Sequence, residues 1–117
     1  MSIYLTYEIN EAELHYEVDS ITDTECFSTI NKAIDHTIKR IGHGLTYGFL
    51  VDEQSDGVYK AVTEKRDDRG LIRYTELFNA IKEDFECGRY FSVVMFEGHQ
   101  ENWQCYYTIV IEEKEVQ

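Results

Sequence analysis

The sequence predicts an α+β fold, with a single, mainly antiparallel sheet of about six strands and two amphipathic helices packed on it. Three observations support this fold class. Short stretches with apolar residues at every second position occur in pairs, which is typical of β-hairpins. Two longer stretches carry apolar residues at three- and four-residue steps, which is typical of helices that pack on a core. The resulting order is ββαββαββ, in which both helices can cover one face of the sheet.

Length and composition predict one folded domain, residues 1–117. The chain is long enough for a single core, and no linker or low-complexity tract divides it. No apolar run approaches the roughly 20 residues that a membrane-spanning helix needs, and the N-terminus lacks a secretory signal pattern. We therefore expect a cytoplasmic protein. Three cysteines, an odd number without paired spacing, indicate reduced packing residues rather than a disulfide framework or a zinc site.

The N-terminal third is predicted to contain a hairpin and the first helix. Apolar and polar residues alternate over 3–9 and again over 14–18, with a turn at 10–12. Thr22 and Glu25 have the spacing of a capping box, which predicts that the helix begins there and ends before Gly42. The apolar stripe of this helix comprises Phe27, Ile30, Ala33, Ile34, Ile38 and Ile41.

The middle of the chain is predicted to form a second hairpin and the second helix. Residues 46–51 and 58–63 are the expected strands, joined by the turn 52–57, which ends in an Asp-Gly pair. The second helix is predicted to begin near Thr75 and to end at Gly88. Its apolar positions are Leu77, Phe78, Ala80, Ile81 and Phe85.

The last hairpin is the most apolar part of the sequence. Its strands, 90–96 and 103–111, consist mostly of aromatic and β-branched residues, so at least one face must be covered. One alternating set belongs to the core. The other set mixes tyrosines with small hydroxyl residues, and two interpretations remain open for it: an exposed protein-binding face, or a face covered by a second helix. Its members are Tyr90, Ser92, Val94, Phe96, Gln104, Tyr106, Thr108 and Val110.

The charge is strongly negative and unevenly distributed. The net charge is −12, with −7 in residues 1–31, −1 in residues 32–96 and −4 in residues 97–117. Such a protein repels nucleic acid and anionic membranes and attracts basic partners, although solubility alone would also explain the acidity. If the first hairpin pairs beside the last one, the two acidic ends form one surface around Trp103 and Tyr106.

No residue pattern predicts catalysis, a metal or a cofactor. The four histidines have no metal-ligand spacing, and the glycines form no phosphate-binding motif. Cys26 falls in the first turn of the predicted first helix, where the helix dipole lowers a thiol pKa, but neighbouring Asp23 and Glu25 oppose this effect. We therefore expect a protein that is not an enzyme, with a small cysteine or histidine hydrolase as the weakest alternative.

Residues 77–96, with the sequence LFNAIKEDFECGRYFSVVMF, run from an amphipathic helix through a glycine into an aromatic strand. This segment resembles a pattern in bacterial immunity proteins that neutralise nuclease toxins of colicin or contact-dependent inhibition systems. The resemblance implies a small, acidic, non-enzymatic α/β protein that blocks the basic active site of a toxin. It covers only these 20 residues and assigns no binding residue.

These observations lead us to expect an acidic inhibitor of a basic protein, most simply an immunity protein against a nuclease toxin domain. The alternative is a phage-type anti-defence protein that mimics DNA, but both predicted helices carry lysines, which disfavours an extended array of carboxylates. No direct contact with nucleic acid or membrane is expected. The candidate partner-binding residues are Asp19, Asp23, Glu25, Glu97, Glu101, Trp103 and Tyr106, and as a second choice the turn residues Asp52, Glu53 and Asp56.

Overall fold

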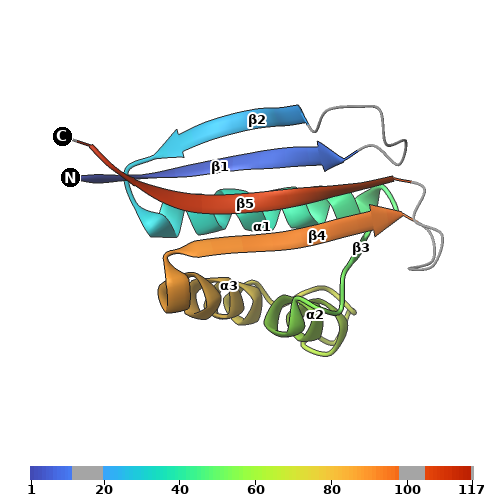
Figure 1. The fold of residues 1–117 in the computed structure, drawn as a ribbon. Coiled ribbons are helices and arrows are strands. Elements are labelled where there is room, and N and C mark those ends of the chain that lie inside the picture. Colours follow the sequence, from blue (N-terminus) through green and yellow to red (C-terminus); the bar gives the residue numbers. More distant parts are fainter. Residues whose placement is uncertain (12–19, 98–104, 117) are drawn as a thin grey trace.

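A computed structural model describes residues 1–11, 20–97 and 105–116, and shows a five-stranded antiparallel sheet with three helices in this part of the chain (Figure 1). The α+β class and the single antiparallel sheet are confirmed, whereas the described residues form five strands rather than about six, and three helices rather than two. The elements are β1 (Ser2–Glu11), β2 (Ser20–Phe27), α1 (Ile30–Thr46), β3 (Leu50–Val51), α2 (Asp56–Thr63), α3 (Tyr74–Gly88), β4 (Tyr90–Glu97) and β5 (Cys105–Glu115).

The first and last strands pair at the centre of the sheet, whose order is β2-β1-β5-β4-β3. β1 and β5 are antiparallel over ten residue pairs, from Ser2 opposite Glu115 to Glu11 opposite Tyr106. The two termini therefore lie together at one end (Figure 1), and the N-terminal ammonium is 3.3 Å from Oε1 of Glu115. The expected pairing of the N-terminal hairpin strand beside the last hairpin is confirmed for β1.

The core lies between the sheet and the helices. Phe91, Val93 and Met95 of β4 and Ile109 and Ile111 of β5 are buried against the helices, so the predicted core parity of the last hairpin is confirmed. Burying each large apolar side chain contributes roughly 1.5–3 kcal/mol, so this layer dominates the stabilisation. The helical side of the core consists of Ala33, Ile34, Ile41, Val58, Ala61, Val62, Leu77, Ile81 and Phe85.

The predicted start of the first helix is wrong. Thr22 and Glu25 lie in β2, which pairs with β1, and α1 begins only after Thr29, whose side chain accepts a hydrogen bond from the Lys32 amide at 3.3 Å. Pairing with a neighbouring strand here outweighs a local capping pattern. The predicted helix end at Gly42 is also wrong, because Ile41 and Leu45 continue the apolar stripe and α1 runs to Thr46.

The predicted second hairpin is wrong in most of its length. Only Leu50 and Val51 of residues 46–51 form a strand, and residues 58–63 lie in α2. Val58, Ala61 and Val62 are buried together because their spacing of three and four places them on one side of a helix. Short, β-branched stretches such as this one do not distinguish strand from helix by composition.

The remaining element boundaries are close to expectation. α3 begins one residue before Thr75 and ends at Gly88, as predicted, and Arg89 then adopts a left-handed conformation with φ of 57°. β1 extends through Glu11, so the predicted turn at 10–12 is wrong at its first two residues. The strand predicted at 14–18 lies outside the described residues.

Gly44 is the closest contact point between α1 and the sheet. A Cβ atom added at this position would collide with the Tyr107 hydroxyl and come within 2.9 Å of Cε of Met95. A Cβ atom added at Gly42, about half a turn away, would meet no other atom within 4 Å. Replacing a helical glycine with alanine otherwise stabilises a helix by about 0.5–1 kcal/mol. The two glycines of α1 therefore differ in whether they can accept a side chain.

We expect Gly42→Ala to raise the free energy of unfolding by about 0.5–1 kcal/mol and Gly44→Ala to lower it by about 1 kcal/mol, because overpacking outweighs the helix propensity. Urea denaturation of the two variants measures the difference. Adding Tyr107→Phe to Gly44→Ala should recover part of the loss. Equal stabilisation by both alanines would contradict the close packing at Gly44.

Candidate functional site

The described helices all pack on one face of the sheet, and Figure 1 shows α1 behind it. The opposite face, here called the open sheet face, is formed by the alternate residues of three strands. Of the two interpretations that the sequence left open, coverage by a helix is not found among the described residues, and the choice between them stays a prediction. Its residues are Ile3, Leu5, Tyr7 and Ile9 of β1, Tyr106, Thr108, Val110, Glu112 and Lys114 of β5, and Tyr90, Ser92, Val94 and Phe96 of β4.

The open sheet face has its own layer of packed apolar side chains. Val110 is fully buried and Phe96 is 5% exposed, although neither belongs to the helix-facing core. Tyr90, by contrast, is 46% exposed. Aromatic and β-branched side chains that pack along neighbouring strands stiffen such a surface. The face is therefore ordered and apolar at its centre, with tyrosine rings at its margin.

Glu112 lies within these apolar surroundings. Its cross-strand neighbours are Leu5 on β1 and Tyr90 on β4, and its Oε2 accepts a hydrogen bond from the Tyr7 hydroxyl at 3.0 Å. Burial, followed by the hydrogen bond to Glu112, raises the pKa of Tyr7 to about 12. The phenol thus remains a hydrogen-bond donor at neutral pH. No sequence motif marks Tyr7 or Glu112, although the alternation of residues in β1 places Tyr7 on the same face as Ile3, Leu5 and Ile9.

The strand order brings several predicted partner-binding residues to one end of the sheet. Tyr106 is opposite Glu11, and Glu97 is opposite Cys105, so the acidic N-terminal and C-terminal strands end side by side. Glu97 is exposed, and Tyr106 is half-buried on the open sheet face. Three further candidates, Asp19, Glu101 and Trp103, lie outside the described residues, and their part in this surface stays a prediction.

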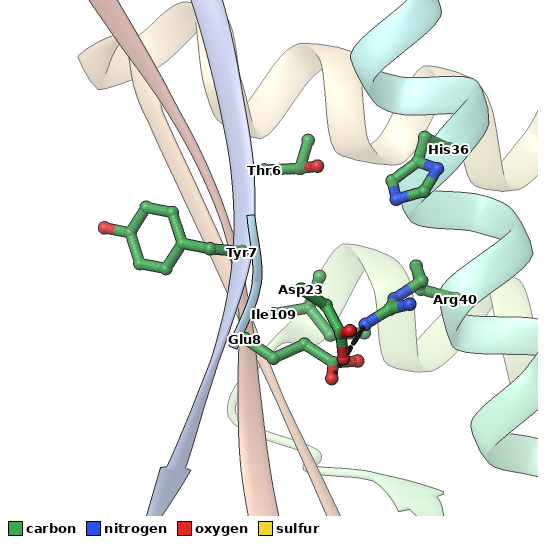
Figure 2. Close-up of a pocket in the computed structure, with 7 residues that line it drawn as sticks. All are labelled: Thr6, Tyr7, Glu8, Asp23, His36, Arg40 and Ile109. Carbon is green, nitrogen blue, oxygen red and sulfur yellow. Dashed lines mark ion pairs between the residues drawn. The ribbon is translucent and has the colours of Figure 1, made fainter. Parts of the chain in front are cut away.

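Asp23 is exposed, but it is already paired with a cation of the same protein. It adopts a positive φ of 55° in the irregular part of β2, where the pairing register with β1 shifts. Nη2 of Arg40 is 2.8 Å from Oε2 of Glu8 and 2.8 Å from Oδ2 of Asp23, and Figure 2 shows both carboxylates at this one guanidinium nitrogen. Tyr7 points to the other side of β1 in the same view. Glu25, the neighbouring candidate, is exposed on β2.

The Arg40 cluster connects α1 to the edge of the sheet. Burial raises the pKa of Glu8, although the Arg40 charge acts in the opposite direction, whereas hydrogen bonding to Arg40 lowers the pKa of Asp23. Burial also lowers the pKa of His36 beside them. The space between these side chains is too small for a water molecule, and the buried Thr6 hydroxyl has no hydrogen-bond partner among the described residues. The cluster therefore holds elements together and offers no room for a ligand.

The three acidic residues of the turn 52–57, the second-choice binding site predicted from the sequence, lie in different environments. Asp52 is only 5% exposed, and its Oδ1 accepts a hydrogen bond from the Gln54 amide at 3.0 Å. Glu53 is exposed, and Asp56 pairs with Lys60 at 3.2 Å. Asp56 also lines a groove of about 450 Å³ between α2 and α3. The acidic residues that join it there are Glu83 and Asp84.

The structure changes the position assigned to Cys26. This residue is exposed in β2, so its predicted place in the first turn of a helix is wrong. Within residues 1–11, 20–97 and 105–116, there is no group of three or more His, Cys, Asp or Glu side chains that could hold a metal ion. None of the helices described in these ranges is long and apolar enough to cross a membrane.

Removing the Arg40 charge should destabilise the protein in a pH-dependent manner. In Arg40→Met, Glu8 remains largely buried without its cation, and we expect a loss of about 2 kcal/mol at pH 7, below the roughly 3–5 kcal/mol for a fully buried pair. A carboxyl group whose folded-state pKa is raised destabilises the fold above that pKa, and the cost disappears as the pH falls through it. The loss relative to the unmodified protein should therefore be smaller at pH 5 than at pH 7.

Urea denaturation at the two pH values measures this effect. Lys39→Met provides a matched control, because Lys39 forms an exposed pair with Asp35 at 3.1 Å on the same helix. Such a pair contributes about 0.3–0.5 kcal/mol. An Arg40→Met loss as small as that of the control, or one that does not change with pH, would show that the cluster contributes little to the fold.

A scan against protein-family models, a search of curated proteins and a search of solved structures found no match to this chain.

Proposed function

We propose that this protein is a non-enzymatic inhibitor that binds a basic protein, with a nuclease toxin domain as the expected partner. The observation that carries the proposal is the open sheet face, which is apolar at its centre, has tyrosines at its margin and is not covered by a described helix. An ordered surface of this kind has the composition of a binding site, because the centres of protein interfaces are enriched in aromatic residues.

Charge supports a basic partner. The net charge is −12, and the described part of the open sheet face carries one base, Lys114, beside the carboxylate of Glu112. The two acidic stretches at the chain ends are joined in the sheet by the pairing of β1 with β5. Carboxylates around an aromatic surface steer a basic partner toward it and select against acidic ones. In a nuclease, they would occupy positions that otherwise hold phosphates.

The structure narrows the set of carboxylates proposed to contact the partner. Asp23 and Asp52 are already engaged by Arg40 and by the Gln54 amide, so their charges contribute mainly to folding. Glu25 and Glu97 are exposed, and Glu97 is next to the open sheet face at the end of β4. We assign the contacts first to Glu97 and Tyr106, because Glu25, opposite Thr6, lies on the helix-facing side of β2; Glu25 forms one separate surface, and Glu53 and Asp56 form another.

The proposal predicts a tight complex with the product of a neighbouring gene that encodes a basic toxin domain. The purified proteins should form this complex in pull-down and by calorimetry, and binding should block the toxin's nuclease activity. Because exposed charges are screened over about 8 Å at physiological ionic strength, the association rate should fall at least about tenfold between low and physiological salt. Stopped-flow fluorescence measures this rate.

Two variants with the same loss of one negative charge distinguish electrostatic steering at the proposed binding surface from a general effect of net charge on the association rate. Glu97→Gln should slow association more than Glu76→Gln, which removes the same charge from an exposed position on α3. The absence of any complex with such a basic domain would overturn the proposal. A complex that leaves the nuclease active would also contradict it, since inhibition is the proposed role. An association rate that is independent of salt would remove electrostatic steering from the argument.

A further inference from the structure

Two adjacent glutamates of β5, Glu112 and Glu113, differ in the groups that pair with their carboxylates. Glu113, on the helix-facing side, is held by a bidentate pair with Arg89, whose Nε and Nη2 lie 2.7 Å and 2.8 Å from its two carboxylate oxygens. This pairing lowers the pKa of Glu113 to about 2. Glu112, on the open sheet face, has no such cation among the described residues. Within the same part of the chain, its carboxylate is held by the 3.0 Å hydrogen bond from the Tyr7 hydroxyl.

The surroundings of Glu112 make an unpaired charge there costly. Its cross-strand neighbours are Leu5 and Tyr90, and the side chain is half-buried. A partly desolvated carboxylate loses hydration that a single hydrogen bond does not replace, since it has about four acceptor positions. Lys114, two residues along the same strand, is exposed and forms no ion pair with Glu112 within the described ranges. The carboxylate of Glu112 thus has acceptor capacity that the described residues do not use.

The two tyrosines next to Glu112 suit one particular cation. The Tyr90 side chain is directly across the strand pair from Glu112 and is about half exposed, so part of its ring is accessible. The Tyr7 hydroxyl donates to one carboxylate oxygen and so restrains the orientation of the group. A guanidinium group pairs with a carboxylate through parallel hydrogen bonds and stacks on aromatic rings, whereas an ammonium group acts as a point charge.

We propose that Glu112, Tyr7 and Tyr90 form a docking site for an arginine side chain of a basic protein partner. On the open sheet face, the guanidinium group would form a bidentate pair with Glu112. Arg89 forms the same kind of pair with Glu113 on the opposite face. Tyr90 provides the stacking surface, and Tyr7 positions the carboxylate. The identity of the partner rests on the proposed inhibitory function, whereas the recognition of arginine by this site does not.

The site is tested with a small probe, without the partner. Uniformly ¹⁵N,¹³C-labelled protein is titrated with N-acetyl-arginine amide, and the chemical shifts of the Glu112 carboxyl carbon and of the Tyr7 and Tyr90 rings are followed. We expect saturable shifts confined to these residues and their neighbours. The citrulline analogue, which has nearly the same shape without the charge, should cause none. The lysine analogue should bind several-fold more weakly, because it cannot form the planar fork.

Variants then assign the effect to individual groups. Glu112→Gln should abolish the shifts caused by the arginine probe, and Glu76→Gln, the same charge change on α3, should leave them intact. Tyr90→Leu should weaken binding by about two- to fivefold, the range expected for an exposed cation–π contact. The amide spectrum of each variant shows whether its fold is preserved. Tyr7→Phe removes the hydroxyl that positions the Glu112 carboxylate and keeps the aromatic ring, so it measures the contribution of the hydroxyl alone.

The possible outcomes distinguish a failure of the arginine site from a failure of the proposed function. Unchanged arginine binding in folded Glu112→Gln, or shifts that map to the carboxylates of the helices, overturns the arginine site. If the basic partner binds Glu112→Gln as tightly as it binds the unmodified protein, the site is overturned while the inhibitory function stands. If the arginine probe binds as expected but no basic domain forms a complex, the site stands and the proposed function is overturned.

Discussion

The antiparallel pairing of β1 with β5 is the interaction on which the rest of the structure depends. It joins the two ends of the chain over ten residue pairs at the centre of the sheet, and every other strand is added outward from it. Because these contacts span almost the whole sequence, forming them requires closing a very long loop, which the burial of apolar side chains on both faces must offset. The same pairing brings the two acidic stretches of the sequence to one sheet, so a folding constraint also determines the distribution of charge.

The alternation of side chains along β5 separates the residues that pack against the helices from those on the open sheet face. Ile109 and Ile111 enter the core beneath the helices, whereas Val110 and Glu112 belong to the open sheet face. A register shift of one residue would exchange these two sets and place Glu112 in the core. The bidentate contact between Arg89 and Glu113 opposes such a shift, since it holds β5 against the residue that follows α3. An ion pair on one face therefore helps to determine which groups the other face presents.

The sequence predicts the structure correctly where the spacing of apolar residues depends directly on which side chains are buried. The positions of α3 and the core parity of the last hairpin follow from the spacing of Leu77, Ile81 and Phe85 and from the alternation of Phe91 with Val93. It was not sufficient where a distant contact decided the structure. Residues 20–27 form a strand because β1 offers them a partner, and residues 56–63 form a helix although β-branched residues suggest a strand. The candidate site shows the same division. Tyr106 was identified from its parity, but the meeting of Tyr7, Tyr90 and Glu112 depends on three strands far apart in the chain.

The carboxylates of this protein fall into two groups with different consequences for its charge. One group is paired within the fold: Glu8, Asp23, Asp35, Asp56 and Glu113 face cationic side chains at close range, Glu115 faces the N-terminal ammonium, and Asp52 accepts a backbone hydrogen bond. The charge available to a partner therefore comes from the remaining carboxylates. Exposed ones such as Glu25 and Glu97 remain well hydrated and act mainly at a distance, because water screens close contacts between exposed charges. Glu112 differs from them, since its apolar neighbours reduce hydration and strengthen any direct pairing. In the proposed complex, long-range attraction and local recognition would therefore belong to different residues: the exposed carboxylates would attract basic proteins in general, and the half-buried carboxylate of Glu112 would discriminate among them.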